Sequence, residues 1–283
     1  MAKVINRSSE RVRNRMVGMS SALEMVAIEI VRQAGALLLD RPHTLEVATK
    51  TSDVDVVTQM DKASEELVRK YLEKHRPDDG LLGEEGVDIP SKSGITWICD
   101  PIDGTVNYLY ELPGWCISLA AEEHGEVVAG AVYAPLLYGG AIWSATKGGG
   151  AWLQMGEGER KRLSIGVPPP MSRALLATGF SYSAEVRRAQ GARFAKMIDQ
   201  VRDIRRMGAA AVDLCLVASS AVDGYFEEGL NPWDLAAGGL IAREAGALVT
   251  NLAGGEADVT MVVAAHPELN KQIRELIDSV AGG

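Results

Sequence analysis

The sequence predicts a mixed α/β protein, and three patterns along the chain indicate this fold class. Apolar residues recur at helical spacing over residues 20–40 and again over 61–74. Between residues 96 and 153, short β-favouring runs alternate with glycine-rich turns. Beyond residue 170, β-favouring and helical patterns follow one another. We therefore expect two helices, then a run of antiparallel strands, then a second half that mixes strands and helices.

The size and composition of the chain are those of a globular protein. Its 283 residues suffice for one large domain or for two smaller ones that share an interface. The three cysteines, Cys99, Cys116 and Cys215, show no CxxC spacing, so we expect reduced thiols and no zinc site. No apolar run approaches the ~18 residues of a membrane span, and Met1–Arg15 lack the apolar centre of a signal peptide. We therefore predict a cytoplasmic protein with no membrane partner.

The net charge restricts the classes of ligand. Its value of −9 argues against nucleic acid as the main ligand, because phosphate backbones favour clustered Lys and Arg. A phosphorylated small molecule is compatible with it, since metal ions can supply local positive charge. Residues 1–18 carry five basic side chains and one acidic one. This segment could touch an acidic partner, but we expect a disordered, solvated extension.

The expected elements of the first half follow from local patterns. A long amphipathic helix is expected from about Ser20 to Asp40, ended by Arg41-Pro42. A second helix starts near Asp61 and runs to about Lys74. Strands are expected at residues 96–99, 116–122, 127–134, 141–144 and 151–153.

A charged and then proline-rich segment, Glu157–Pro170, is the best candidate for a boundary between two halves. We expect residues 19–160 and 161–283 to form these halves within one structural unit. The second half is expected to contain strands at 174–177, 224–227 and 259–265, and helices at 185–200, 208–218, 232–245 and 267–280.

Two carboxylates three residues apart stand at the end of the strand expected at Thr96–Cys99. The string Asp100-Pro101-Ile102-Asp103-Gly104-Thr105 should end that strand, because proline disfavours ladder pairing. Like charges this close repel unless one is protonated or a cation lies between them. A divalent metal bound by oxygen ligands would resolve the repulsion. A turn in which each Asp caps nearby backbone N–H groups explains the residues equally well.

Three further acidic positions also have both a functional and a structural interpretation. Asp61 could be catalytic, or a cap near a helix N-terminus worth about 1 kcal/mol. Glu84 stands in a Gly83–Gly86 loop, where paired Glu residues are usually only solvated charge. Asp234 follows Pro232, which favours the first position of a helix. A carboxylate in that first turn interacts favourably with the helix dipole.

Taken together and in this order, four pieces resemble the inositol monophosphatase family of magnesium-dependent, lithium-sensitive phosphatases. They are Gly83-Glu84-Glu85, the Asp-Pro-Ile-Asp-Gly-Thr string, a Gly-Ala segment at Gly208, and Trp233-Asp234 followed by Glu244-Ala245-Gly246. The resemblance extends from about Ser20 to Val280. It implies a layered sandwich of alternating helix pairs and sheets, and a homodimer.

The resemblance also implies a role for each matched position. Two or three Mg²⁺ ions would be held by Glu84, Asp100, Asp103 and Asp234, and by the backbone carbonyl of Ile102. Asp61 and Thr105 would orient a metal-bound water for attack with no covalent phosphoenzyme, and Glu84 would belong to the same catalytic group. Substrate contacts are implied for Asp103, Gly104, Thr105, Gly208, Ala209, Ala210, Glu227 and Asp234. Lys50 matches a loop lysine near the active site.

The expected activity is hydrolysis of inositol 1-phosphate and related small sugar or polyol phosphates. Ala209, Ala210 and Glu227 suit a compact polyol, and Asp103-Gly104-Thr105 leans toward the inositol phosphatase branch. Alternatives on the same metal site are histidinol phosphate and fructose 1,6-bisphosphate. Arg205-Arg206 could meet a second phosphate, although a surface or dimer-interface pair is the preferred interpretation. A further alternative is a binding role in a transcription complex, in which the basic extension would take part.

Overall fold

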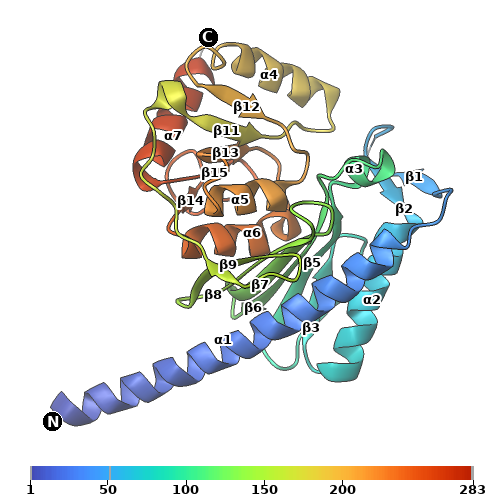
Figure 1. The fold of residues 1–283 in the computed structure, drawn as a ribbon, viewed down its shortest axis with the longest axis vertical. Coiled ribbons are helices and arrows are strands. Elements are labelled where there is room, and N and C mark those ends of the chain that lie inside the picture. Colours follow the sequence, from blue (N-terminus) through green and yellow to red (C-terminus); the bar gives the residue numbers. More distant parts are fainter. Residues whose placement is uncertain (1, 51, 282–283) are drawn as a thin grey trace.

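The computed structural model describes residues 2–50 and 52–281, with side chains over 20–50 and 52–280. Over these residues the helices and sheets stack in alternating layers (Figure 1). One outer layer holds α1 (Ala2–Leu39) and α2 (Gln59–His75), and the other holds α4 (Ala184–Ala195) and α7 (Pro267–Ala281). Between the two sheets lie α5 (Ala210–Ala218) and α6 (Pro232–Glu244). The predicted layered α/β fold is confirmed.

The larger sheet has the strand order β10-β9-β8-β7-β6-β5-β3-β4. All its pairings are antiparallel except that between β3 and β5. The expected run of antiparallel strands is therefore present. Its strands are β3 (Gly80–Gly83), β4 (Asp88–Ile89), β5 (Ile95–Asp103), β6 (Cys116–Glu123), β7 (Glu126–Ala134), β8 (Ala141–Thr146), β9 (Gly150–Met155) and β10 (Lys161–Arg162).

The smaller sheet has the order β12-β11-β13-β15-β14 and mixes parallel and antiparallel pairs. The proline-rich stretch before residue 171 connects the larger sheet to it. Its strands are β11 (Leu175–Thr178), β12 (Asp203–Arg205), β13 (Gly224–Glu227), β14 (Leu248–Thr250) and β15 (Val262–Ala265). The remaining elements are a hairpin of β1 (Val47–Thr49) and β2 (Val56–Thr58), the short α3 (Thr105–Leu109) and the 3₁₀ turn η1 (Met171–Arg173).

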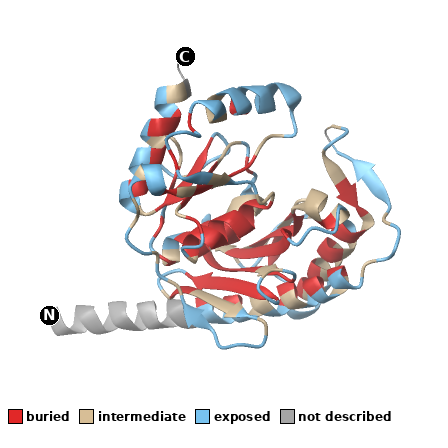
Figure 2. Cartoon of the chain, turned by 45° about the horizontal axis from the view of Figure 1, so that its top comes forward, coloured by how far each residue is buried: buried red, intermediate tan, exposed pale blue. Residues whose placement is uncertain are grey.

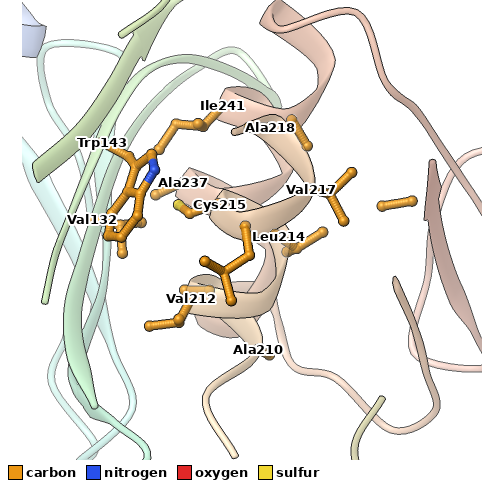
Figure 3. Packing of buried hydrophobic residues seen from close by; sticks show 14 of the residues in the cluster. Val132, Trp143, Ala210, Val212, Leu214, Cys215, Val217, Ala218, Ala237 and Ile241 are labelled. Atoms are coloured by element: carbon orange, nitrogen blue, oxygen red, sulfur yellow. The ribbon is translucent and has the colours of Figure 1, made fainter. Parts of the chain in front are cut away.

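The two-residue period of the strands separates the cores. Trp97 and Cys99 of β5 pack in the cluster beneath α1 and α2, whereas Ile98 between them packs in the cluster around α5 and α6. Figure 3 shows Leu214 and Cys215 of α5 near Trp143 and Val132 of the larger sheet. Buried residues dominate α5, α6 and the sheets, whereas α4 is mostly exposed (Figure 2). The central helices are therefore held from both sides.

Several element boundaries differ from expectation. Helix α1 begins at Ala2 and so runs through most of the segment expected to be a disordered extension, since no proline interrupts it. Helix α4 ends at Ala195 instead of Gln200, and β15 begins at Val262 instead of Val259. The buried helix expected from Gly208 begins at Ala210, because Gly208 has a left-handed backbone (φ +90°).

The strand expected to end at Asp100-Pro101 continues to Asp103. Asp100 pairs with Ser118 and Asp103 with Cys116, so β5 has one more residue than β6 in this interval. This bulge explains how Pro101 is tolerated, because a bulged residue owes no hydrogen bond to the ladder. On its other side, β5 pairs with β3 only as far as Cys99. Asp100 and Asp103 consequently lie beyond the last residue of β5 that pairs with β3.

We predict that Gly35→Ala lowers the midpoint of thermal unfolding. A Cβ atom there would lie 2.3 Å from Cε1 of Tyr133 on β7, and the ring has to move to accommodate it. Overpacking of this kind costs about 1–3 kcal/mol. Gly191→Ala in α4 is the matched control, since its Cβ meets nothing within 4 Å and alanine favours a helix by about 0.5–1 kcal/mol. Equal midpoints for the two variants would contradict the close packing of α1 on β7.

Candidate active site

A cavity of about 490 Å³ opens between the two sheets, and both halves of the chain line it. Seven acidic and two basic residues are among its described lining, so its charge is strongly negative. The acidic residues are Asp55, Glu84, Asp100, Asp103, Glu227, Glu228 and Asp234, and the basic ones are Lys50 and Arg206.

Asp100 and Asp103 occupy the floor of this cavity at the end of β5. Oδ1 of Asp100 accepts a hydrogen bond from the N–H of Ile102 at 3.1 Å. The turn expected as the alternative to a metal site is therefore present at Asp100. Asp103 instead reaches across to the second half, where its oxygens accept from the N–H groups of Ala210 (3.2 Å) and Ala211 (2.7 Å). The turn and metal interpretations are thus compatible, because Asp100 forms the turn and still faces the cavity.

Glu84 and Asp234 approach the same floor from opposite halves. Glu84 follows β3, and its Oε1 accepts from Nζ of Lys50 at 2.9 Å. Asp234 lies in the first turn of α6, where its Oδ2 accepts from the N–H of Asn231 at 2.6 Å in a capping box. Asp234 therefore lies in the first turn of the helix, as Pro232 predicted. Ile102 also lines the cavity.

Asp61 is fully buried at the start of α2 and lies behind the cavity wall. It is the third residue of that helix, where its Oδ2 accepts from the N–H (2.8 Å) and the hydroxyl (2.7 Å) of Thr58. Its Oδ1 lies 3.0 Å from the hydroxyl of Thr105, which does line the cavity. The Thr105 hydroxyl is also 3.0 Å from the carbonyl of Ile102, and its single proton serves one acceptor at a time. Asp61 therefore contacts the cavity through Thr105.

The other end of the cavity is formed by Gly208, Ala210 and Glu227. Ala209 is buried at the start of α5 and is not part of the lining. Glu227 accepts a hydrogen bond from the hydroxyl of Tyr225 at 2.6 Å. Gly104 requires glycine, because its φ is +90° and a Cβ would lie 2.9 Å from the carbonyl of Gly114. This glycine keeps the turn after Asp103 close to Gly208, whose carbonyl is the next nearest atom.

The aspartates of the cavity floor have raised pKa values, which a nearby positive charge would lower. Burial, reinforced by Glu84, Asp103 and Asp234, raises the pKa of Asp100 well above its usual range. Burial and Asp234 do the same for the pKa of Asp103, although the N–H of Ala211 opposes the shift. Burial raises the pKa of Asp234 to about 7 and that of Asp61 to about 6. These carboxyl groups resist ionisation in the absence of a cation.

The residues of the floor fit a hard divalent cation. All the donors are oxygens, as Mg²⁺ prefers. Burial, and after it the neighbouring carboxylates, raises the pKa values of Asp100, Asp103 and Asp234, and a bound cation would oppose that shift. Among the described residues, no group of three or more acidic, His or Cys side chains has the arrangement of a formed metal site. Asp103 and Asp234 instead hydrogen-bond the backbone N–H groups of Ala211 and Asn231.

Sequence reasoning identified Asp61 but missed Ser64 and Glu65 on the same face of α2. Ser64 donates to the carbonyl of Pro101 at 3.1 Å, and Glu65 accepts from the loop that carries Glu84. Asp61, Ser64 and Glu65 continue the buried stripe of Val68 and Leu72 at helical spacing. That spacing was the available signal, because polar residues on the buried stripe of a helix need partners.

An acidic, oxygen-lined cavity between two sheets, with a glycine turn beside paired aspartates, is typical of metal-dependent hydrolases. Residues 19–281 match the inositol monophosphatase family, and the chain belongs to that family. It is a phosphatase, and members of this family are generally metal-dependent.

Known relatives cover nearly the whole chain. An inositol-1-monophosphatase SuhB of Mycobacterium tuberculosis is 40% identical over 94% of this chain and 93% of its own length. A Nus factor SuhB of Pasteurella multocida is 37% identical over 88% of this chain and 92% of its own length. The crystal structure of the extragenic suppressor protein suhB of Bartonella henselae has a TM-score of 0.83 at 30% identity, covering 90% of this chain and 98% of that one.

Two negative expectations can be compared with the described residues. The cysteines at positions 99, 116 and 215 are free and buried. Within the described part of the chain, no helix is both long and apolar enough to span a membrane.

We predict that added Mg²⁺ raises the thermal stability more at about pH 8 than at about pH 5.5. The pKa values of Asp61, Asp100, Asp103 and Asp234 are raised, so the metal-free folded protein binds more protons than the unfolded chain. That contribution to stability is complete below about pH 4 and is lost as pH rises through the folded pKa values, near 6 to 7 for Asp61 and Asp234. Mg²⁺ competes with these protons and stabilises the deprotonated floor.

Thermal unfolding with and without Mg²⁺ at the two pH values measures this difference. A gain in midpoint that is equal at both pH values would show that the ion does not bind where these carboxyl groups lie.

Proposed function

We propose that this protein is a Mg²⁺-dependent phosphomonoesterase acting on inositol 1-phosphate and related small sugar or polyol phosphates. Glu84, Asp100, Asp103 and Asp234, with the carbonyl of Ile102, would hold two or three Mg²⁺ ions. When bound, these ions supply the positive charge that neutralises the carboxylates and the phosphate and activates water. The convergence of four carboxylates from both halves on one cavity floor carries the proposal.

The protein's own groups have separate tasks in this proposal. The backbone N–H groups of Gly104 and Thr105 hold phosphate oxygens, which the absence of a side chain at Gly104 allows. The hydroxyl of Thr105 accepts a hydrogen bond from the attacking water, and its own proton is directed to Asp61. Asp61 suits this task because burial raises its pKa to about 6, which makes it a better base than an exposed aspartate. Hydrolysis needs no covalent intermediate on the protein.

The polyol would lie against Gly208, Ala210 and Glu227. Small side chains there leave room for a ring, and the carboxylate of Glu227 can accept hydrogen bonds from hydroxyl groups. Ala209 would contribute through its backbone, since its side chain is buried away from the cavity. The relative from M. tuberculosis is named an inositol-1-monophosphatase, which agrees with this assignment.

A homodimer and lithium sensitivity stay predictions from the family resemblance, and a cytoplasmic location stays a prediction from the sequence. We do not propose a transcriptional role from the name Nus factor carried by the P. multocida relative. The net charge of −9 gives it no electrostatic support.

We predict that Asp100→Asn abolishes the release of phosphate from inositol 1-phosphate in the presence of Mg²⁺. The substitution removes the charge at the centre of the acidic floor while keeping the size of the side chain. Asp88→Asn is the control, because Asp88 is exposed on β4 and outside the cavity lining. A phosphate-ester panel assayed with both variants measures the effect. Undiminished hydrolysis by Asp100→Asn would sink the metal-site assignment.

A second candidate substrate, fructose 1,6-bisphosphate, is favoured by the position of Arg206. Its side chain lines the cavity beside Gly208, and among the described residues it makes no ion pair. Its neighbour Arg205 pairs with Asp203 at 2.7 Å. A second phosphate on the substrate could therefore meet Arg206.

If this bisphosphate is a substrate, Arg206→Ala should lower kcat/KM for it by about tenfold or more, since hydrogen bonds to charged groups are worth about 1.5–3 kcal/mol. The value for inositol 1-phosphate should change little, as should both values for the control Arg205→Ala. Equal losses of kcat/KM on both substrates would exclude Arg206 as the residue that binds a second phosphate.

A further inference from the structure

Glu65 is a buried carboxylate whose hydrogen bonds go to the loop that carries Glu84. It lies on α2 with 2% of its surface exposed. Its Oε2 accepts from the N–H of Glu85 at 2.9 Å, and its Oε1 lies 3.3 Å from the N–H of Val87. It is not among the residues that line the cavity.

The fit between Glu65 and this loop is tight. A Cβ atom on Gly83 would stand 2.2 Å from Oε2 of Glu65, so only glycine allows the carboxylate to approach the backbone here. Two backbone bonds also hold the loop: Gly83 N–H donates to the carbonyl of Val87 at 2.7 Å, and Glu84 N–H to the carbonyl of Cys99 at 3.2 Å. Nζ of Lys50 contacts the side chains of Glu84 at 2.9 Å and Glu85 at 2.5 Å. Glu65 therefore supplies two of the hydrogen bonds that fix residues 84–87.

Stability alone does not account for a carboxylate at this position. Burial raises the pKa of Glu65, and the charges of Glu85 and Glu84 add to the shift, while the two N–H groups oppose it. A buried charge near two other carboxylates costs free energy that an apolar residue would not. Its hydrogen bonds nevertheless fix the backbone direction from which Glu84 enters the cavity.

We infer that Glu65 is a positioning residue that orients Glu84 toward the cation. This inference rests on the proposed function. The same face of α2 supports it, because Asp61 contacts Thr105 and Ser64 contacts the carbonyl of Pro101. Three neighbouring side chains of one helix thus hold three segments of the floor. Residues that orient metal ligands in this way typically contribute 10–100-fold to metal affinity.

Glu65→Gln tests the inference, with Glu66→Gln as its matched control. Glutamine keeps the shape of the side chain, but its NH₂ group cannot accept from a backbone N–H. Glu66 is next in sequence, partly exposed, and pairs with Arg69 and Lys70 on the surface. Calorimetric titration of the full chain with Mg²⁺ should give a dissociation constant about 10–100-fold weaker for Glu65→Gln and unchanged for Glu66→Gln. At saturating Mg²⁺, kcat should return to within about threefold of the wild type.

A second variant keeps the test decisive where Glu65→Gln folds poorly. Gly83→Ala should displace the carboxylate from the loop while the sequence of α2 stays unchanged, and it should weaken Mg²⁺ binding in the same way. In both variants, amide hydrogen exchange at Glu85 and Val87 should accelerate. Wild-type Mg²⁺ affinity in folded Glu65→Gln, or faster exchange with no loss of affinity, would overturn the inference and reduce Glu65 to a structural role.

The wild-type protein separates this failure from that of the proposed function. Absence of Mg²⁺ binding and of phosphatase activity in the wild type would remove the proposed function itself. Normal binding by both the wild type and Glu65→Gln would remove only the assignment of Glu65.

Discussion

The contact between Asp103 and the first N–H groups of α5 holds the candidate site together. Asp103 ends β5 in the first half, and Ala210 and Ala211 begin α5 in the second. One carboxylate therefore satisfies N–H groups of a buried helix that no side chain of its own caps. Because α5 also packs between the two sheets, this contact links the end of β5 at the cavity floor to the central helix layer. The acidic side chains of both halves line the same cavity.

Placing these carboxyl groups in a buried site lowers the stability of the fold and is explained by the chemistry proposed for the site. Asp61, Asp100, Asp103 and Asp234 are buried or partly buried together, and burial raises the pKa of each. Most of them also serve a structural purpose: Asp61 and Asp234 cap helices, and Asp100 closes a turn. The capping interpretation therefore holds for Asp61 and Asp234, and the turn interpretation holds for Asp100 but not for Asp103. What they leave unexplained is the number of carboxylates at one place, and a bound cation, as proposed, would account for that number.

Sequence reasoning reached the mixed α/β class, the antiparallel run and the position of Asp234, because each has a local signal: periodicity, turn residues, or Pro232 at a helix start. The layered arrangement was expected only from the family resemblance. It placed the end of β5 too early, since a proline inside a strand is visible in sequence and the bulge that accommodates it is not. It also missed Glu65, whose partners are backbone N–H groups 20 residues or more along the chain. The helical spacing of Glu65 with Asp61 and Val68 is visible in the sequence. Its partner is the loop after β3, and the position of that loop depends on the parallel pairing of β3 with β5, which the sequence does not show.

The central claim is that Glu84, Asp100, Asp103 and Asp234 share divalent cations in one cavity. Crystals grown with Mn²⁺ in place of Mg²⁺ would test it most directly, because the anomalous scattering of manganese locates each ion. The account predicts two or three peaks on the cavity floor, next to the carboxylates of Glu84, Asp100, Asp103 and Asp234 and the carbonyl of Ile102. Peaks confined to other carboxylates, or a floor without any peak at saturating Mn²⁺, would contradict it.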